Sequence, residues 1–577
     1  WLKNVSSLAL SMGNCGGTPI SLRLGLGTRI GGVLRRTRTH HNVPRQLPHI
    51  SATLDAAPGH SPKLPLLGRY HKAPRRIEDD YILDPSVLGL GCSGVVKLAR
   101  SKDHPSGSQR FAVKEVGLFG LAGEDLVRVR SEVEIFLRMD HPHIARLFDV
   151  YETDKSMFLV MECMEGGELY SRVERRKVFT ETEAADATWQ ILLALNYIHS
   201  HDIVHRDVKL ENFLYDSEEG NHLKMIDFGF SRKCEPNSRL QQRLGTLPYS
   251  APEVLAGNYT FRCDLWSLGV IVFILLAGSM PFGGPEKILL QRISQGRYTM
   301  QPKQWRHISR EAKDFVRSLL QVNPERRLSA QKSLEHPWLA KRRSRCAGKA
   351  EVDSLVVNAL REFARASRFR RCCMEIMAWS LSNEERARVR QYFLAMDQNK
   401  HGTIVLWELK KALHDKFGVP DDEIQHIFNV MDFDNDAEVQ YSDFLAAMLG
   451  TCMPLHDHLL QAAFNRFDAD HSGVITEENI REVLGGDTFD GEQVKQLISE
   501  ADPASPQHIT YPEFVAYLRR GNPPVGRSNC VDETSSVDSH EGAALLQVSR
   551  RGRCSPSLRY KEVAAFLVNN PKCCVVS

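Results

Sequence analysis

The alternation of apolar and polar residues along the chain predicts a small number of regular elements. Residues 184–199 carry apolar side chains at helical spacing, which predicts an amphipathic helix. The short apolar run 158–163 predicts a buried strand, and the longer run 268–278 predicts a buried helix. The longer run is about half of what a bilayer span requires, so we expect it in a protein core. Residues 1–76 sustain no apolar period and contain many Pro and Gly, so we expect them to be unfolded or loosely ordered.

A further helical pattern spans residues 352–381 and follows a basic patch at 341–345. Its first turns repeat apolar residues at helical spacing, namely Leu355, Val356, Ala359, Leu360 and Phe363. Its later turns interleave other apolar residues with Arg365, Arg368, Arg370 and Arg371. The pattern predicts a basic amphipathic helix. Such a helix suits a membrane surface, a calmodulin-like groove or permanent packing on the domain that precedes it.

Four twelve-residue windows begin at Asp397, Asp432, Asp468 and Asp502, offset by 35, 36 and 34 residues. A repeat of this kind is typical of helix–loop–helix calcium-binding units that occur in pairs. The eighth position of each window is apolar, as expected where two loops join through a short strand; these residues are Ile404, Val439, Ile475 and Ile509. We therefore expect an all-α region with four such loops over residues 385–520.

The four loops differ in the ligands that they offer to calcium. Loop 1 keeps the turn glycine and the closing Glu but has an unusual fifth residue; its candidate ligands are Asp397, Asn399, His401, Thr403 and Glu408. Loop 2 has Ala437 in place of the glycine and closes on a shorter carboxylate; its candidate ligands are Asp432, Asp434, Asp436, Glu438 and Asp443. Loop 3 closes on the neutral Asn479; its candidate ligands are Asp468, Asp470, Ser472 and Val474.

Loop 4 keeps only its end residues, Asp502 and Glu513, with Ala504 and Pro506 where oxygen ligands are needed. We therefore expect loops 1 and 2 to bind calcium, loop 3 to bind it weakly, and loop 4 to be empty. Because loop 4 keeps its apolar eighth residue, we expect it to support the shape of loop 3.

A loop in the middle of the chain carries residues suited to phosphoryl transfer. Residues 205–212 read His-Arg-Asp-Val-Lys-Leu-Glu-Asn, and Asp-Phe-Gly begins fifteen residues after Asn212. This spacing brings together a base, a cation and two metal-binding side chains, which can pass a phosphoryl group from Mg-ATP to a hydroxyl. These residues are Asp207, Lys209, Asn212 and Asp227.

A glycine-rich segment and a lysine precede that loop. Glycines let backbone amides approach phosphates, where a Cβ would obstruct them; the segment contains Gly89, Gly91, Gly94 and Val96. Lys114 follows at the spacing of two strands and suits the α- and β-phosphates. We expect Glu132 to form an ion pair with Lys114, and Glu134 is a near alternative on another side of the same helix.

Together these motifs resemble a protein kinase domain over residues 81–338. The resemblance implies that Asp207 is the base, that Lys209 steadies the γ-phosphate, and that Asn212 and Asp227 hold Mg²⁺. Residues 158–163 would run into a hinge beside the adenine of ATP, with Met161 at the back of the adenine pocket and Glu162 and Cys163 following it. Residues 251–253, Ala-Pro-Glu, match the end of an activation segment, and Arg327 matches the partner of its Glu253.

A kinase joined through a basic helix to four calcium loops resembles the calcium-dependent protein kinases of plants and alveolates, over about residues 81–520. The resemblance implies a bilobal α+β kinase fold followed by an all-α EF-hand, calmodulin-like domain. It implies a calcium-activated serine/threonine kinase that uses ATP, Mg²⁺ and Ca²⁺. Residues 341–381 would be an autoinhibitory junction that occludes the kinase until the calcium-loaded loops capture it.

The substrate and the control of the kinase can be predicted further. Glu168 and Glu211 match positions that meet an arginine in basophilic kinases, and the pair Phe273-Ile274 stands where some relatives carry a third carboxylate. We therefore expect protein substrates with the pattern Arg-x-x-Ser/Thr. Gln242 stands where many kinases carry an activating phosphothreonine near Arg206, so we expect control from elsewhere in the chain.

Composition excludes some partners and compartments. The net charge of +3 and the hydrophobic content of 42% give no indication of a nucleic-acid partner. The 13 cysteines are odd in number and irregularly spaced, which favours a reducing, cytoplasmic compartment. Two alternatives to a calcium-activated kinase are a calcium-sensing scaffold with an inert kinase fold and a calcium-independent kinase with structural loops. Intact Lys114, Asp207 and Asp227 argue against the scaffold.

Both ends of the chain carry candidate lipidation motifs. If translation began at Met12, Gly13 could be myristoylated and Cys15 palmitoylated; a transit peptide and an unmodified tail are the alternatives. Residues 521–577 return to a flexible composition and end in Cys574-Val-Val-Ser, a farnesylation pattern. We therefore expect membrane association through lipid.

Overall fold

The computed structural model describes residues 69–520, with gaps at 92–93, 103–108, 122, 177–178, 236–237, 346–351, 469, 485–490 and 502–507. The candidate lipid sites Gly13, Cys15 and Cys574 lie outside the described residues. Within the described ranges, no helix is long and apolar enough to cross a bilayer.

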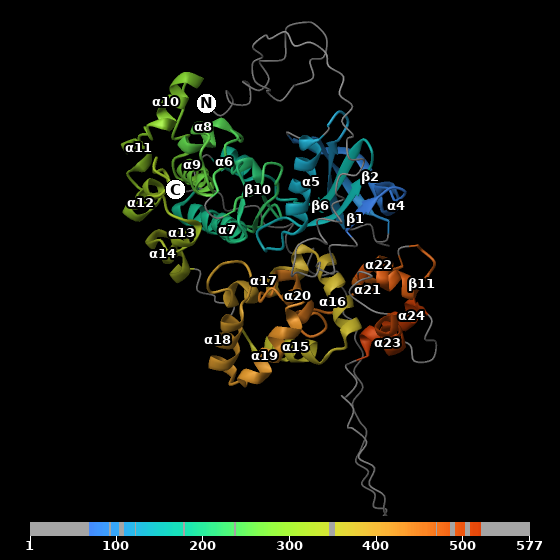
Figure 1. Ribbon diagram of the computed structural model, residues 1–577. Coiled ribbons are helices and arrows are strands. Elements are labelled where there is room, and N and C mark those ends of the chain that lie inside the picture. Colours follow the sequence, from blue (N-terminus) through green and yellow to red (C-terminus); the bar gives the residue numbers. More distant parts are fainter. Residues whose placement is uncertain are drawn as a thin grey trace, which may run out of the picture. The chain divides into compact units, whose positions relative to one another are not determined.

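A six-stranded sheet and the long helix α5 (Glu124–Leu137) form the first lobe, blue to cyan in Figure 1. The strand order is β1-β5-β6-β4-β3-β2. The strands are β1 (Tyr70–Lys72), β2 (Tyr81–Gly91), β3 (Gly94–Ser101), β4 (Arg110–Gly117), β5 (Leu147–Glu152) and β6 (Ser156–Glu162). The short helix α4 (Ile77–Asp80) leads into β2. The buried strand predicted at 158–163 is confirmed as β6.

Residues 69–76 contain regular structure, so the expectation that residues 1–76 are unfolded is wrong for this last part. Strand β1 pairs in parallel with β5, with Tyr70 opposite Val150. Arg69 is buried and donates hydrogen bonds to three backbone carbonyls of the first lobe. Polar contacts and edge pairing hold this segment, and neither produces an apolar period in the sequence.

The second lobe is mainly helical and green in Figure 1. Its helices are α6 (Leu169–Arg176), α7 (Glu181–Ser200), α8 (Pro252–Ala256), α9 (Arg262–Ala277), α10 (Glu286–Ser294), α11 (Pro302–Trp305), α12 (Arg310–Leu319), α13 (Ala330–Leu334) and α14 (Pro337–Arg345). Short strands and turns carry the loops between them: β7 (Ile203–Val204), η1 (Leu210–Asn212), β8 (Phe213–Tyr215), β9 (Leu223–Met225), β10 (Arg232–Lys233) and η2 (Leu247–Tyr249).

The two helices predicted in this lobe are confirmed as α7 and α9. Thr180 caps α7 and Glu183 completes the capping box, which fixes where the helix begins. Helix α9 is buried on every side. A Cβ at Gly269 would lie 2.9 Å from side-chain atoms of Leu319 and Leu320, so this glycine permits the close packing of α9 on α12.

Eight helices with paired loops, which we call the loop region (383–520), follow in yellow to red. Its first half contains α17 (Asn383–Met396), α18 (Leu406–Phe417), α19 (Asp421–Met431) and α20 (Tyr441–Met448). Its second half contains α21 (Asp457–Phe467), β11 (Val474–Thr476), α22 (Glu477–Leu484), α23 (Gly491–Ala501), β12 (His508–Thr510) and α24 (Tyr511–Arg519). Ile404 pairs with Val439, and Ile475 pairs with Ile509, as the sequence predicts.

The segment 352–381, which we call the junction, forms two helices where the sequence predicts one. α15 (Ser354–Arg365) ends at Ala366, whose backbone is extended, and Ser367 caps α16 (Arg368–Ser380). The sequence contains no Gly or Pro at this break, and its apolar residues keep their helical spacing across it. The sequence therefore predicts a single helix. The apolar faces of both helices join the core of the loop region.

Candidate active site and calcium loops

A buried carboxylate of α9 fixes the candidate catalytic loop. Asp264 accepts hydrogen bonds from the backbone N–H groups of His205 and Arg206, each at 2.9 Å. Arg206 has a left-handed φ of 69°, which is strained for a residue with a Cβ. The two hydrogen bonds hold the backbone in this conformation immediately before Asp207.

Asp207 lies at the centre of the candidate catalytic group. Lys209 Nζ donates to Asp207 Oδ2 at 2.5 Å, and the Asn212 amide donates to the Asp207 carbonyl at 2.8 Å. The N–H and hydroxyl of Thr246 donate to Asp207 Oδ1 at 3.1 and 2.8 Å. The structure therefore brings the three expected loop residues together and adds Thr246, which the sequence does not identify as a contact of the base.

Lys114 on β4 pairs with Asp227 rather than with Glu132. Lys114 Nζ donates to Asp227 Oδ1 at 2.9 Å, and no ion pair joins Lys114 to Glu132 among the described residues. The expected Lys114–Glu132 pair is therefore not formed in this conformation. Burial raises the pKa of Glu132 to about 7. Glu134, the alternative, pairs with Arg138 on its own helix at 3.0 Å.

The glycine-rich segment forms the end of the β2–β3 hairpin. Gly89 lies opposite Val96, and Gly91 lies opposite Gly94. The turn itself, residues 92–93, lies outside the described residues. Gly94 has a φ of 153°, and a Cβ there would lie 1.8 Å from the carbonyl oxygen of Glu115. A side chain at this position is therefore excluded, whether or not phosphate is bound.

A cavity of about 80 Å³ lies between β4, α5 and the Asp-Phe-Gly segment. Its walls include Lys114, Glu132, Met161 and Asp227. The carboxylate of Glu162 accepts hydrogen bonds elsewhere, from Lys224 Nζ at 2.8 and 2.7 Å. Only the backbone of Glu162 is therefore suited to form hydrogen bonds with a nucleotide.

The segment between Asp227 and Glu253 is held by polar contacts. Arg206 Nη1 donates to Gln242 Oε1 at 3.5 Å, a long and weak hydrogen bond. Arg327 forms the expected pair with Glu253 through two bonds, at 2.5 and 3.0 Å, and both side chains are buried. The backbone of the segment is therefore anchored at its C-terminal end through Glu253 and in its middle through the Gln242 carbonyl, which accepts the Tyr259 hydroxyl at 2.6 Å, whereas the Gln242 side chain is held weakly.

Glu168 and Glu211 lie close to the catalytic lysine. Burial raises the pKa of both carboxyls, and the charge of Lys209 acts on both in the opposite direction. Among the described residues, neither forms an ion pair, and Glu211 Oε2 is buried without a hydrogen-bond partner. Two carboxylates without a cationic partner are suited to receive an arginine of a substrate.

Loop 1 gathers its candidate calcium ligands around an incompletely hydrogen-bonded carboxylate. Asp397 Oδ2 accepts the Gly402 N–H at 3.1 Å, whereas the buried Asp397 Oδ1 has no partner among the described residues. Burial raises the pKa of Asp397 to about 7. Glu408 turns back over the loop and accepts the N–H groups of Gln398 and Asn399. Thr403 is buried, and His401 donates its N–H to Asn399 Oδ1 at 2.8 Å.

Loop 2 brings three carboxylates together. Asp432, Asp434 and Asp436 each have an oxygen within 4.8 Å of the others, and the first two side chains are buried. Ala437 occupies the turn position with a left-handed φ of 65°. Asp443 accepts the Gln440 N–H at 2.8 Å as a helix cap, and Glu438 lies 4.0 Å from His201 of the second lobe.

Loop 3 uses its polar residues mainly within the loop. Asp468 accepts the N–H groups of Ser472 and Gly473 at 2.8 and 2.9 Å, and Asp470 Oδ1 accepts the Ser472 N–H at 3.3 Å. Asn479 caps α22 through Thr476. Val474 lies in β11, and residues 502–507 of loop 4 lie outside the described residues.

Two family models match the chain. The protein kinase domain matches residues 84–339, and the EF-hand domain pair matches residues 386–449 and 457–519. The bilobal fold followed by EF-hands that the sequence predicts is therefore confirmed.

Three relatives extend this similarity over most of the chain. Calcium-dependent protein kinase 5 of Plasmodium falciparum is 33% identical over 445 residues, 76% of this chain and 78% of the relative. Calcium-dependent protein kinase 3 of Oryza sativa is 35% identical over 455 residues, 77% of this chain and 81% of the relative. Calcium-dependent protein kinase 12 of Arabidopsis thaliana is 35% identical over 454 residues, 78% of this chain and 91% of the relative. With its kinase motifs, its four paired loops and this similarity, the chain belongs to the calcium-dependent protein kinases.

Proposed function

We propose that Asp207 is the base through which this calcium-activated serine/threonine protein kinase accepts the proton of the substrate hydroxyl. The observation that carries the proposal is the convergence of Lys209 and Thr246 on one carboxylate. Thr246 occupies Oδ1 and Lys209 contacts Oδ2, so the carboxylate is held in one orientation. Lys209 is then placed to steady the transferred phosphoryl group, as in other kinases.

Asn212 and Asp227 are the residues proposed to hold Mg²⁺. In the described residues, the second carboxylate oxygen of Asp227 and the amide oxygen of Asn212 accept no hydrogen bond, so both suit a hard cation. The ion would neutralise phosphate charge. Lys114 would bind the α- and β-phosphates beneath the glycine-rich hairpin. Met161 would lie at the back of the adenine pocket, and Cys163 would lie beside the adenine.

Loops 1 and 2 are proposed as the calcium sites of the first EF-hand pair. Asp397 Oδ1, which accepts no hydrogen bond from the described residues, and the cluster of Asp432, Asp434 and Asp436 supply the oxygen ligands that Ca²⁺ prefers. Backbone oxygens of Thr403 and Glu438 and the side chains of Asn399, Glu408 and Asp443 would complete the two sites. Loop 3 would bind more weakly, because it closes on Asn479.

The junction is proposed to inhibit the kinase at low calcium. The proposal rests on the apolar faces of α15 and α16, which the EF-hand helices bury here and which need a covering partner when those helices release them. Residues 341–381 would then cover part of the kinase until calcium restores the packing described above.

Substrates are proposed to carry an arginine three residues before the acceptor Ser or Thr. Glu168 and Glu211 support this motif, because a guanidinium would give both half-buried carboxylates a cationic partner.

We also propose membrane association through lipid on Gly13 and Cys15 or on Cys574. Incorporation of a farnesyl label that is lost in Cys574→Ser would support the second site.

Radiolabelled phosphate transfer to a peptide with and without calcium tests the whole proposal. We expect transfer in calcium, loss of transfer in chelator and loss in Asp207→Asn under both conditions. A peptide with Ala in place of the upstream Arg should be a poorer substrate. Equal transfer in calcium and chelator would favour a calcium-independent kinase, and no transfer would favour an inert scaffold.

A further inference from the structure

A buried ion cluster lies behind the hinge and is shared by the kinase and the EF-hands. At its centre, Glu162 accepts hydrogen bonds from Lys224 Nζ on β9 and from Arg386 Nη2 on α17. All three side chains are buried. Burial alone would raise the pKa of Glu162, but Arg386 and Lys224 hold it well below its usual range. Burial also lowers the pKa of Lys224 well below its usual range, so Arg386 is the main charged partner of the hinge carboxylate, and Lys224 completes its hydrogen bonds.

Arg386 is positioned by the first turn of α17. Its Nε donates to the Ser382 carbonyl at 3.1 Å, and its Nη2 donates to Asn383 Oδ1 at 3.0 Å. Ser382 is also the cap of α17, in a capping box with Glu385. The guanidinium is thus fixed by the same turn that begins the first EF-hand, so it moves with that EF-hand.

Neighbouring kinase charges also find partners in the junction and the EF-hands. Arg146 Nη1 donates to the carbonyls of Ala378 and Trp379 at 2.6 and 3.2 Å. Asp140 accepts the Ser442 N–H at the beginning of α20, at 2.7 Å. Burial of such charges is favourable only when their hydrogen bonds are completed. In the docked arrangement, Arg146 and Asp140 therefore obtain hydrogen bonds that the kinase alone does not supply.

The cluster connects directly to the proposed adenine site. Glu162 stands between Met161 and Cys163, and its N–H donates to the Arg146 carbonyl at 2.9 Å. In return, the Arg146 N–H donates to Glu162 Oε2 at 3.1 Å. The backbone and the carboxylate of Glu162 are thus both bonded to Arg146, the residue immediately before β5. Loss of a hydrogen bond to the Glu162 carboxylate should therefore also disturb the backbone of residues 161–163.

We propose that Arg386 is a positioning residue for ATP: by completing the bonds of Glu162, it fixes the hinge and raises nucleotide affinity when the first EF-hand is docked. The inference rests on the proposed nucleotide site at residues 161–163. Nucleotide binding and calcium-dependent docking are then coupled through Arg386. Because such coupling is reciprocal, bound nucleotide must also favour calcium binding.

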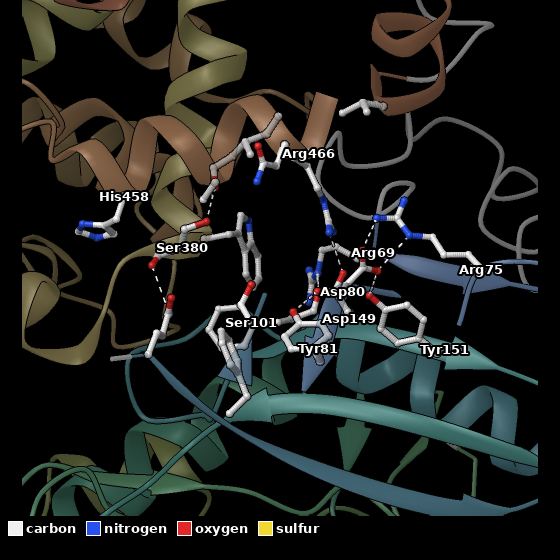
Figure 2. Close-up of a pocket in the computed structure, with 18 residues that line it drawn as sticks. Arg69, Arg75, Asp80, Tyr81, Ser101, Asp149, Tyr151, Ser380, His458 and Arg466 are labelled. Atoms are coloured by element: carbon white, nitrogen blue, oxygen red, sulfur yellow. Dashed lines mark hydrogen bonds and ion pairs between the residues drawn. The ribbon is translucent and has the colours of Figure 1, made fainter. Parts of the chain in front are cut away.

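A second arginine of the EF-hands provides a matched control. Figure 2 shows Arg466, from α21, reaching Asp149 on β5, where its Nη1 donates at 2.8 Å. Asp149 also binds the Tyr81 hydroxyl at 2.7 Å and His71 at 3.1 Å. Arg466 therefore also pairs with a buried kinase carboxylate, but its own side chain is half-buried and its partner lies outside the hinge.

The experiment measures the affinity of a fluorescent ATP analogue for the full chain, in calcium and in chelator. In calcium, we expect Arg386→Met to weaken binding by about fivefold or more, with partial recovery in Arg386→Lys. Arg466→Met should leave the affinity close to that of the wild type, and in chelator all variants should be equal. Saturating analogue should lower the calcium midpoint of the wild type and not that of Arg386→Met.

Equal affinity of Arg386→Met and wild type in calcium would overturn the inference. An equal loss in Arg386→Met and Arg466→Met would also overturn it, because the effect would then belong to docking in general. Thermal unfolding of each variant checks that it is folded. A wild-type chain that binds no analogue would instead contradict the proposed nucleotide site.

Discussion

Lys114 Nζ lies 2.9 Å from Asp227 Oδ1, and this ion pair joins β4 to the Asp-Phe-Gly segment. Glu132 lines the same small cavity without an ion-pair partner among the described residues. In the proposed complex, Mg²⁺ would bind Asp227, so Lys114 would be free to bind phosphate and to pair with Glu132. Nucleotide binding and the ionisation of Glu132 should therefore be linked.

Nucleotide affinity should decrease as the pH falls below neutrality. Burial raises the pKa of Glu132 to about 7 in the nucleotide-free chain, and pairing with Lys114 would lower it. A group whose pKa falls on binding releases a proton, so the added affinity is present above about pH 7 and is lost below it. Titration calorimetry in two buffers of different ionisation enthalpy measures that proton. Glu132→Gln should abolish the release, and a wild type that takes up protons would contradict the linkage.

Because Gln242 cannot be phosphorylated, phosphatase treatment should leave the kinase activity unchanged. Its 3.5 Å contact with Arg206 is weak, so Gln242→Ala should change kcat/KM little in calcium. Gln242→Glu would give Arg206 a charged acceptor, which is stronger than a neutral one by about 1 kcal/mol, so we expect kcat/KM to rise by up to about fivefold. Steady-state kinetics on a basic peptide measure both variants. A large loss of wild-type activity after phosphatase treatment would contradict this account of the segment.

Ala437→Gly should tighten calcium binding at loop 2. Ala437 has a φ of 65°, and the left-handed conformation costs a residue with a Cβ about 1 kcal/mol or more. Removing that cost should lower the calcium concentration at half-saturation by about fivefold. A calcium titration in an Asp397→Ala background isolates loop 2 from loop 1. Ala437→Ser keeps the Cβ and should behave as the wild type; equal midpoints for Gly and Ser would show that the strain is unimportant.

Local patterns predict the parts of this fold that depend on local packing. The apolar periods identify α7, α9 and β6, and the eighth loop positions identify which loops pair, as Ile404 with Val439 shows. The sequence does not predict the helix break at Ser367. A serine cap without a neighbouring Gly or Pro leaves the helical spacing of the apolar residues unchanged. Strand β1 escapes prediction because polar contacts hold it at the sheet edge.

Long-range pairing decides the parts of the site that the sequence does not predict. The sequence identifies Glu162 only as a hinge residue, yet Arg386, more than two hundred positions along the chain, completes its hydrogen bonds. Both residues are ordinary charged positions on predicted elements, so nothing local distinguishes them. The same holds for Lys114, which pairs with Asp227 rather than with Glu132.

Gly402→Ala should disturb docking of loop 1 on the kinase as well as the loop itself. Gly402 has a φ of 86°, and a Cβ there would lie 2.6 Å from ring atoms of both His141 and Tyr197 in the kinase. The neighbouring Lys400 carbonyl accepts the Asn196 amide at 2.6 Å, so the loop has little freedom to withdraw. Overpacking of this kind costs about 1–3 kcal/mol, in addition to the backbone strain.

Gly473→Ala separates these two costs. Gly473 has a similar φ of 84°, but no described atom lies within 4 Å of the position that a Cβ would take there, so this variant carries only the strain. We expect Gly402→Ala to move the calcium midpoint of activation upward by about tenfold or more, and Gly473→Ala to move it less. Hydrogen exchange at residues 196–197 in calcium reports docking directly and should increase only in Gly402→Ala. Equal shifts in both variants would mean that the close contact with His141 and Tyr197 does not contribute to activation.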